Sequence, residues 1–278
     1  MTSSPLLLCA RQELLLAVRS RWTQIFALVF AGLSLAVASS GYILSGGYGV
    51  QDFARTAASL VQLVILLVPL ASLLMGTLAL TPERGATELL FSQPVPRSSI
   101  LLGKILGLFT ALAAAQALGF GAAGLVIFSQ AGGEGLGTFL FLGLGSLLLA
   151  AIFLGIAALL AAGAPERGRA RVLALALVVW FIAVVVFDVA ALGLASLLPS
   201  GLASRILILA VLINPADAVR TGALLAAEGT TAFGAASLAF LRFTRGPLGA
   251  GLLLTASLLF WLVVPPLLAI GRLRRSDL

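Results

Sequence analysis

Side chains that perform nucleophilic, acid–base or metal chemistry are sparse in this chain. Histidine is absent, and cysteine occurs once, at Cys9. A Ser-His-Asp triad, a Cys-His pair and a histidine metal site therefore cannot be built from these residues alone. Methionine occurs only at Met1 and Met75, which also excludes a copper path of Cys, Met and His. We expect no catalytic residue, no metal site and no cofactor bound by this chain.

One carboxylate, Asp188, follows the apolar run Trp180–Phe187 near the middle of a long hydrophobic stretch. An aspartate at that depth costs roughly 2.5–3.5 kcal/mol, so it must face the bundle interior, water or a partner. We expect no basic residue at the same depth, and Gln116 and Gln62 are the polar candidates. Asp188 and Gln116 are therefore predicted intramembrane polar or gate residues. Two roles stay open for Asp188: a protonated group that donates a structural hydrogen bond, or a group that lines a route or gate.

The segment 81–104 is the second candidate site. Thr81-Pro82 followed by Glu83 predicts the start of a short helix, because an N-cap, a proline at the first position and an early acid favour one. Pro94 and Pro96 then end that helix. Adjacent apolar residues rimmed by charge suggest a protein-docking patch, although the same side chains could lie in the membrane interface. The predicted docking residues, with the basic residue that follows them, are Glu83, Arg84, Glu88, Leu89, Leu90, Phe91 and Arg97.

The segment 199–247 is too long for a simple connection. Its apolar run Ile206–Ile213 is too short to cross a bilayer, which predicts a re-entrant or interfacial hairpin. Asn214-Pro215-Ala216-Asp217 then has the pattern of a helix start. The arginines beyond it would be held either by a protein partner or by anionic lipid headgroups. The predicted contacts on this outer side are Asn214, Asp217, Arg220, Arg242 and Arg245.

The elements that must position these residues are membrane helices. The chain has 278 residues, is 61% apolar and 10% charged, and has a mean hydropathy of +1.17. Soluble domains average about 45–50% apolar and about 25% charged residues, so lipid must be the solvent for most of this chain. We predict an all-α integral membrane protein, a single domain over residues 1–278, with spans at 22–44, 57–80, 105–128, 137–162, 172–198 and 248–271.

The distribution of Lys and Arg predicts the orientation. Twelve of the seventeen lie in the N-terminal segment, the loops after spans two and four, and the tail, which places both termini in the cytoplasm. The net positive charge of the chain is therefore better explained by its orientation in the membrane than by binding to nucleic acid. Residues 1–21 favour an elbow helix in the inner interface over a simple basic leader. A signal-peptidase site after Ala36-Val37-Ala38 is the less favoured alternative.

No phosphate-binding loop accompanies these spans. Gly103-Lys104 is followed by Ile105 and lacks the upstream glycine of a G-x-x-x-x-G-K-[ST] motif. If the protein performs ATP-driven work, a separate chain must therefore hydrolyse the ATP.

The cytoplasmic loop resembles the signature of ABC-2-type permeases. Glu83, Gly85-Ala86-Thr87-Glu88-Leu89-Leu90, Pro94-Val95-Pro96-Arg97 and Leu101-Leu102-Gly103-Lys104 follow one another in the family's order. Three further stretches are similar to the NosY permeases of nitrous oxide reductase maturation: Ala10-Arg11-Gln12-Glu13-Leu14 with Arg19-Ser20-Arg21-Trp22, Trp180 to Asp188, and Leu212-Ile213-Asn214-Pro215-Ala216-Asp217. In such permeases the segment corresponding to residues 81–104 is a coupling helix that docks into the nucleotide-binding subunit.

The resemblance implies a multi-pass permease of the bacterial inner membrane. Its implied partners are a second copy of itself, two copies of a NosF-like cytoplasmic ATPase that binds ATP and Mg, a periplasmic NosD-like protein, and membrane lipid. Its implied role is to support assembly of the copper site of nitrous oxide reductase. Two alternatives remain: a secondary transporter coupled to protons through Asp188, and an ABC-2 exporter of unrelated cargo. An intramembrane enzyme is disfavoured, because it would need an Asp pair or a Ser-Lys dyad at membrane depth, whereas Asp188 is alone there and Lys104 is expected at the inner edge.

Overall fold

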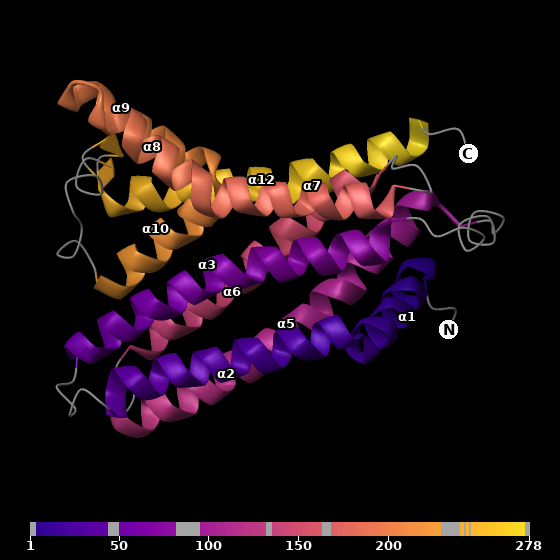
Figure 1. The fold of residues 1–278 in the computed structure, drawn as a ribbon, viewed down its shortest axis with the longest axis horizontal. Coiled ribbons are helices and arrows are strands. Elements are labelled where there is room, and N and C mark those ends of the chain that lie inside the picture. Colours follow the sequence, from indigo (N-terminus) through magenta and orange to yellow (C-terminus); the bar gives the residue numbers. More distant parts are fainter. Residues whose placement is uncertain are drawn as a thin grey trace.

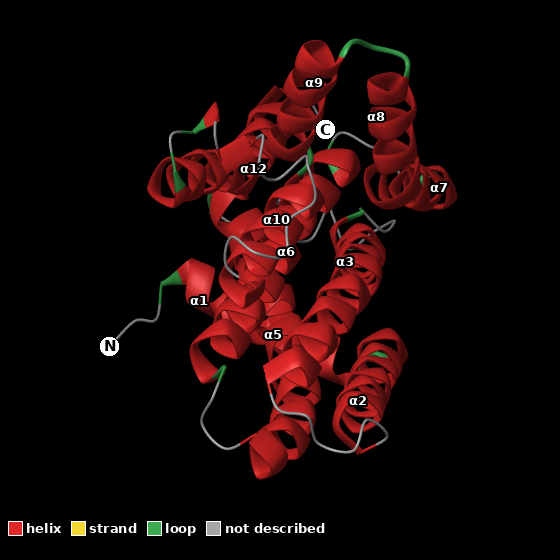
Figure 2. Ribbon diagram, turned by 90° about the vertical axis from the view of Figure 1, so that its left-hand side faces the viewer, coloured by secondary structure: helices red, strands yellow, loops and turns green. Residues whose placement is uncertain are grey.

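The computed structural model describes residues 4–43, 50–81, 95–131, 135–162, 168–228, 240–241, 243–244 and 246–275. Regular structure within these ranges is helical throughout (Figure 2). The helices with assigned bounds are α1 (Pro5–Arg19), α2 (Arg21–Ile43), α3 (Val50–Leu80), α5 (Arg97–Ala131), α6 (Leu136–Ala161), α7 (Arg169–Phe181), the π-helix η1 (Ile182–Val186), α8 (Phe187–Ser196), α9 (Ser200–Ile213), α10 (Pro215–Glu228) and α12 (Pro247–Arg275).

Six helical stretches are long and apolar enough to cross a membrane, in agreement with the predicted number. They are α2, α3, α5, α6, the continuous run α7–η1–α8, and α12. Two begin earlier than predicted, α3 at Val50 rather than at residue 57 and α5 at Arg97 rather than at residue 105. An established helix adds a hydrogen bond for each residue it gains, so it continues into polar turns beyond the hydrophobic stretch.

The long helices pack side by side into one bundle (Figure 1). The main packing pairs are α2 with α5, α3 with α6, and α6 with α12. Large side chains that lie fully inside the bundle include Phe30, Leu73, Leu112 and Phe153. Both chain termini lie at one end of the bundle, and the α8–α9 hairpin lies at the other end. A chain that crosses a membrane an even number of times has both termini on the same side, which agrees with this arrangement.

Helix α1 exists as predicted, and one of its faces packs against the bundle. Helical periodicity places its leucines in one apolar arc, with Glu13 on the opposite side. In the structure, Ala10, Glu13 and Ala17 pack against the bundle, while Leu7 and Leu15 are exposed. Small residues allow the backbone of α1 to approach α5 closely, and the leucines face outward as they would toward lipid. The face of α1 that contacts the bundle is therefore formed by two alanines and one glutamate, spaced by three and four residues.

Two glycines of α5 make this close approach possible. A Cβ atom on Gly107 would lie 2.5 Å from the carbonyl oxygen of Ala10, and one on Gly103 would lie 2.7 Å from the carbonyl oxygen of Leu6. Both separations are shorter than van der Waals contact allows, so a larger residue would push α1 away from α5. The spacing of four residues between these two glycines thus has a packing role at both positions.

The segment after span five contains two helices that meet at a sharp angle. The stretches Gly201–Ile213 and Pro215–Ala226 are bent by 103° at Asn214. A bend of this size is the geometry of a re-entrant hairpin or a broken span, in line with the predicted re-entrant or interfacial segment. The apolar helix α9 is longer than the predicted run 206–213, because it begins at Ser200.

Candidate functional site

Asn214 fixes the break between α9 and α10. Its Oδ1 accepts a hydrogen bond of 3.1 Å from the backbone N–H of Ala216, as the predicted N-cap requires. Its Nδ2 donates to Oδ2 of Asp217 at 2.8 Å and to the carbonyl oxygen of Ala183 at 2.7 Å. One side chain therefore starts α10, orients the first acid of that helix, and attaches the helix to span five.

The carbonyl that Asn214 reaches belongs to the π-helix η1. A π-helical turn disturbs the regular hydrogen-bond ladder of a helix and frequently marks a functional position. Within a membrane, backbone carbonyls released in this way need a donor from elsewhere in the protein. Asn214 supplies that donor, so the local irregularity of span five and the start of α10 depend on each other.

Helix α12 stabilises the other side of the break. Ser257 Oγ donates to the carbonyl oxygen of Leu212 at 2.5 Å, and Trp261 Nε1 donates to that of Ile213 at 2.9 Å. Both acceptors lie in the last turn of α9, where carbonyl groups lack partners inside their own helix. No local sequence pattern indicates this role for Ser257 or Trp261, because their partners lie more than forty residues away.

A cluster of charges lies directly beside this break. Arg220 Nη1 donates to Oδ2 of Asp188 at 2.5 Å and to Oδ1 of Asp217 at 2.9 Å. The expectation that Asp188 has no basic neighbour is therefore wrong. It assigned Arg220 to the outer side, whereas α10 packs against α3, α6 and α12 in the bundle, where Arg220 reaches Asp188 of span five. The spacing of three between Asp217 and Arg220 on one helix face was the sequence signal for this pair.

The predicted pairing of Asp188 with glutamine is not found. Gln116 is fully buried between α5 and α6, where its Oε1 accepts a hydrogen bond from Ser146. Gln62 is exposed on α3. Asp188 and Gln116 thus belong to separate polar sites. Gln116 and Ser146 form a polar contact inside the helix packing, while Asp188 belongs to the charge cluster with Arg220.

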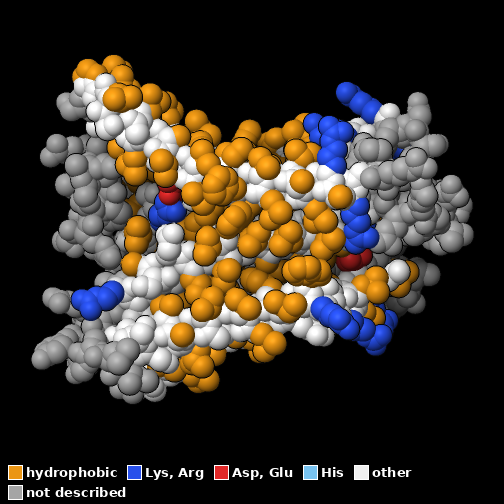
Figure 3. All heavy atoms as spheres, in the orientation of Figure 1, with side chains coloured by type: hydrophobic (Ala, Val, Ile, Leu, Met, Phe, Trp, Pro, Cys, Tyr) orange, Lys and Arg blue, Asp and Glu red, His pale blue; other side chains and the backbone are white. Residues whose placement is uncertain are grey.

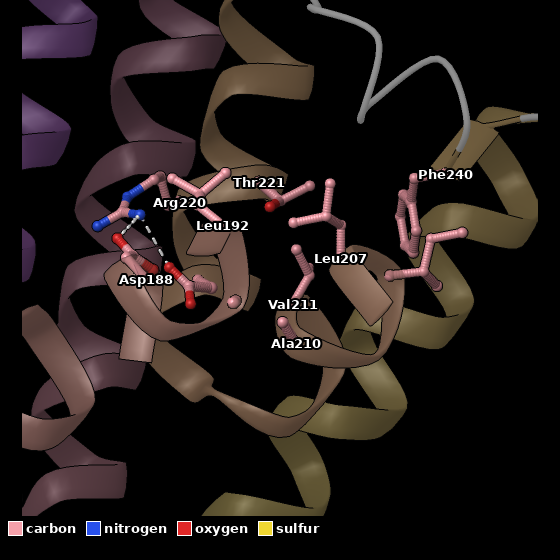
Figure 4. A pocket seen from close by; sticks show the side chains of 11 residues that line it. Asp188, Leu192, Leu207, Ala210, Val211, Arg220, Thr221 and Phe240 are labelled. Carbon is pink, nitrogen blue, oxygen red and sulfur yellow. Dashed lines mark hydrogen bonds and ion pairs between the residues drawn. The ribbon is translucent and has the colours of Figure 1, made fainter. Parts of the chain in front are cut away.

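A cavity of about 190 Å³ adjoins the cluster. Its charged wall consists of Asp188, Asp217 and Arg220, with the Thr221 hydroxyl beside them. Figure 4 shows the ion pairs on one side of this cavity and Phe240 on the opposite side, with α9 side chains between them. The remaining lining is apolar and comes from α8 and α9. The cavity therefore offers one charged wall and one hydrocarbon wall.

The predicted outer contact residues differ in their placement. Asn214 and Asp217 are 4% and 6% exposed, so they act inside the protein and not as a surface for a partner. Arg220 is committed to the two carboxylates. Arg242 and Arg245 lie outside the described residues. An outer docking surface built from Asn214 and Asp217 is therefore not supported, because helix start and ion pairing use both side chains.

Most of the predicted docking segment also lies outside the described residues. This holds for Glu83, Arg84, Glu88, Leu89, Leu90 and Phe91. Its two flanks are described. Thr81 was predicted to cap a following helix, but its hydroxyl donates to the carbonyl oxygen of Thr77 at the end of α3. Arg97 begins α5 and donates from Nη1 to the carbonyl oxygen of Leu273 at 3.0 Å.

Cations at this end of the bundle contact the ends of neighbouring helices. Lys104 Nζ donates to the carbonyl oxygen of Ala79 at 3.0 Å, and Arg169 donates to that of Leu78 at 3.3 Å. Both acceptors lie in the last turn of α3, where free carbonyls and the helix dipole attract positive charge. Arg169, at the start of α7, is unfavourable for the dipole of its own helix. Both cations instead donate hydrogen bonds to free carbonyl groups at the end of α3.

Lys104 also joins α1 to this end. Its Nζ lies 3.7 Å from Oε2 of Glu13, whose side chain is almost fully buried. Burial raises the pKa of Glu13 above its ordinary value, and the charge and hydrogen bond of Lys104 act in the opposite direction. The described groups therefore connect α1, α3 and α5 around the two flanks of the docking segment.

The architecture defines a class of protein. Among the described residues, no three His, Cys, Asp or Glu side chains lie together as a metal site. Six membrane-length helices, with a bent helix pair and a charge cluster beside it, are the architecture of a multi-pass membrane protein.

The family model described as "ABC-2 family transporter protein" matches residues 7–278, and the chain belongs to this family. It is similar to the probable ABC transporter permease protein NosY of Stutzerimonas stutzeri, with 37% identity over 279 residues that cover 96% of each chain. It is also similar to the probable NosY of Pseudomonas aeruginosa, with 38% identity over 218 residues that cover 76% of this chain and 78% of the relative.

Proposed function

We propose that this chain is the membrane subunit through which a cytoplasmic ATPase drives a conformational change on the opposite side of the bacterial inner membrane. The observation that carries the proposal is the match to the ABC-2 family over residues 7–278. A permease without a phosphate-binding loop needs a separate ATPase, which would bind ATP and Mg. Two permease copies and two NosF-like ATPases would form the working assembly.

The finer role follows from the relatives named NosY. We infer that the assembly supports maturation of nitrous oxide reductase by helping to build its copper site, with a NosD-like protein on the periplasmic side. The chain has no histidine and only one cysteine, which disfavours copper ligation by the chain itself. Its contribution would be mechanical or would concern another cargo.

The packing offers a route for such a change. Residues 81–97 connect the end of α3 to the start of α5. Helix α3 packs against α6, α7 and α10, so a displacement at its end reaches the opposite end of the bundle through rigid helices. ATP binding would bias two arrangements of this bundle, since a ligand shifts an equilibrium only through different affinities for the two states.

The proposal is tested by co-purification with the candidate ATPase. We expect the triple charge reversal Glu83→Lys, Arg84→Glu and Glu88→Lys to abolish recovery of the ATPase while the permease still reaches the membrane. Arg171→Glu is the matched control, since it reverses an exposed charge in the first turn of α7. Undiminished recovery with the triple variant would overturn the assignment of residues 81–97 as the coupling segment.

Proton-coupled transport through Asp188 is the weaker alternative. It rested on Asp188 as an isolated acid within the membrane, whereas the structure pairs Asp188 with Arg220. An ABC-2 exporter of unrelated cargo would share the same ATPase coupling. Loss of nitrous oxide reductase copper in a strain that lacks this chain would distinguish the NosY-like role from that second alternative.

A further inference from the structure

The cavity between α8, α9 and α10 combines two kinds of surface. Asp188, Asp217 and Arg220 form one wall, and the hydrocarbon wall includes Leu192, Leu207, Val211 and Phe240. A ligand that filled both parts would need a charged group and an apolar body. Amphiphiles have this composition, and the surrounding bilayer supplies them in excess.

The cavity opens on the side of the bundle, within the second half of span five. Span five runs from Arg169 to Ser196, and at 1.5 Å per residue Asp188 lies about 12 Å from Ser196. Leu192, which lines the cavity, is 62% exposed on the side of the bundle. Figure 3 shows acidic and basic atoms side by side within the otherwise apolar lateral face. A lipid could therefore enter the cavity from the side of the bundle, with its headgroup at the charged wall and its acyl chains in the bilayer.

The charged wall also defines the chemistry of the headgroup. Two carboxylates share one guanidinium, so the three groups carry a formal charge of −1. Both ion pairs use Nη1 of Arg220, and its buried Nε has no hydrogen-bond partner within the described part of the chain. A complementary headgroup would bring N–H donors and positive charge to Asp188, together with an oxygen acceptor for the guanidinium.

We propose that this cavity binds the headgroup of phosphatidylethanolamine. The primary ammonium lies toward Asp188, the phosphate lies toward the guanidinium of Arg220, and the acyl chains follow the apolar wall formed by α8 and α9. Phosphatidylcholine lacks ammonium N–H donors, and phosphatidylglycerol brings only negative charge to a site that is already negative. This lipid site is independent of the ATPase partner.

The full-length chain in detergent tests this assignment directly. Delipidated protein is mixed with equal amounts of phosphatidylethanolamine, phosphatidylcholine and phosphatidylglycerol, and native mass spectrometry measures the bound lipid. We expect phosphatidylethanolamine adducts to exceed both of the others. Asp188→Asn should reduce that preference about tenfold, the effect of losing one charge-assisted hydrogen bond. Arg205→Gln, which removes an exposed charge of α9 outside the cavity, should leave it unchanged.

A second variant keeps the test valid if the charge substitution disturbs folding. Ala210→Phe fills the cavity and leaves Asp188, Asp217 and Arg220 in place. It should reduce phosphatidylethanolamine binding while the melting temperature stays near that of the native chain. Equal binding of phosphatidylethanolamine and phosphatidylcholine, a preference for phosphatidylglycerol, or unchanged binding in both variants would overturn the proposal. Each of these outcomes leaves ATPase co-purification unaffected.

Discussion

Arg220 is the residue on which the charge cluster depends. Its guanidinium contacts both Asp188 and Asp217, whereas each carboxylate contacts that one cation. Removing the cation leaves two acids close together in surroundings that are largely apolar. Removing Asp188 leaves the pair between Arg220 and Asp217 intact. The members of this cluster therefore have unequal effects on stability, although each is charged.

We predict that Arg220→Gln destabilises the chain more than Asp188→Asn does. An uncompensated buried charge costs about 3–5 kcal/mol, and the partial exposure of Arg220 and Asp188 reduces that figure here. Asp188→Asn should cost about 1 kcal/mol, the net value of one hydrogen bond. Melting temperatures in detergent measure both variants, with Arg205→Gln as the control. A larger loss for Asp188→Asn would show that Arg220 is not the shared partner.

Asp188 also shows why this site was only partly predictable. Its isolation in an apolar run identified it as a functional candidate, and the Asn-Pro-x-Asp pattern identified the start of α10. Its partner was missed because Arg220 is 32 residues away and was assigned to the outer side. Local patterns determine where a helix begins, whereas pairing across helices depends on tertiary packing.

At the scale of elements, α1 is attached to α5 by close packing and by one ion pair. Gly103 and Gly107 allow the backbones to approach, and Lys104 reaches both Glu13 and the end of α3. Helix periodicity predicted the existence of α1 and its leucine arc, but not that the face with Glu13 packs against α5. In a membrane protein, large apolar side chains also face lipid, so hydrophobicity alone does not distinguish a packed face from a lipid-facing one.

Glu13 should make the attachment of α1 dependent on pH. Its pKa is raised, so its contribution to stability is full below the ordinary value of 4.5 and is lost as pH rises through the raised native value. We predict that Glu13→Gln stabilises the chain at neutral pH relative to the native sequence, and that the difference shrinks at acid pH. Melting temperatures across this pH range measure it.

Lys104→Gln provides the complementary test of this pair. It should lower the melting temperature at neutral pH, because the buried Glu13 loses its cation, and Glu13→Gln in the same chain should restore part of the loss. A coupling energy of about 0.5–3 kcal/mol is expected for groups in contact. Additive effects of the two substitutions would contradict the pairing of Lys104 with Glu13.

At the scale of the whole molecule, the bundle has two specialised ends. One end holds both termini, the flanks of residues 81–97, and cations that contact the last turn of α3. The other end holds the α8–α9 hairpin, and the cavity with its charge cluster lies beneath it. Composition and hydrophobic runs predicted the number of spans, because each crossing needs about 20 apolar residues. They did not predict that α10 packs against α3, α6 and α12 and brings Arg220 to Asp188.

The central claim is that an external ATPase drives this bundle through residues 81–97. The most direct measurement places a photo-crosslinking residue at Leu90 in native membranes that contain the candidate ATPase. The account predicts a covalent adduct between the two chains, and none when the same group replaces Ala232 in the segment between α10 and α12. Failure of Leu90 to form the adduct, or crosslinking of the ATPase at Ala232 instead, would contradict the account.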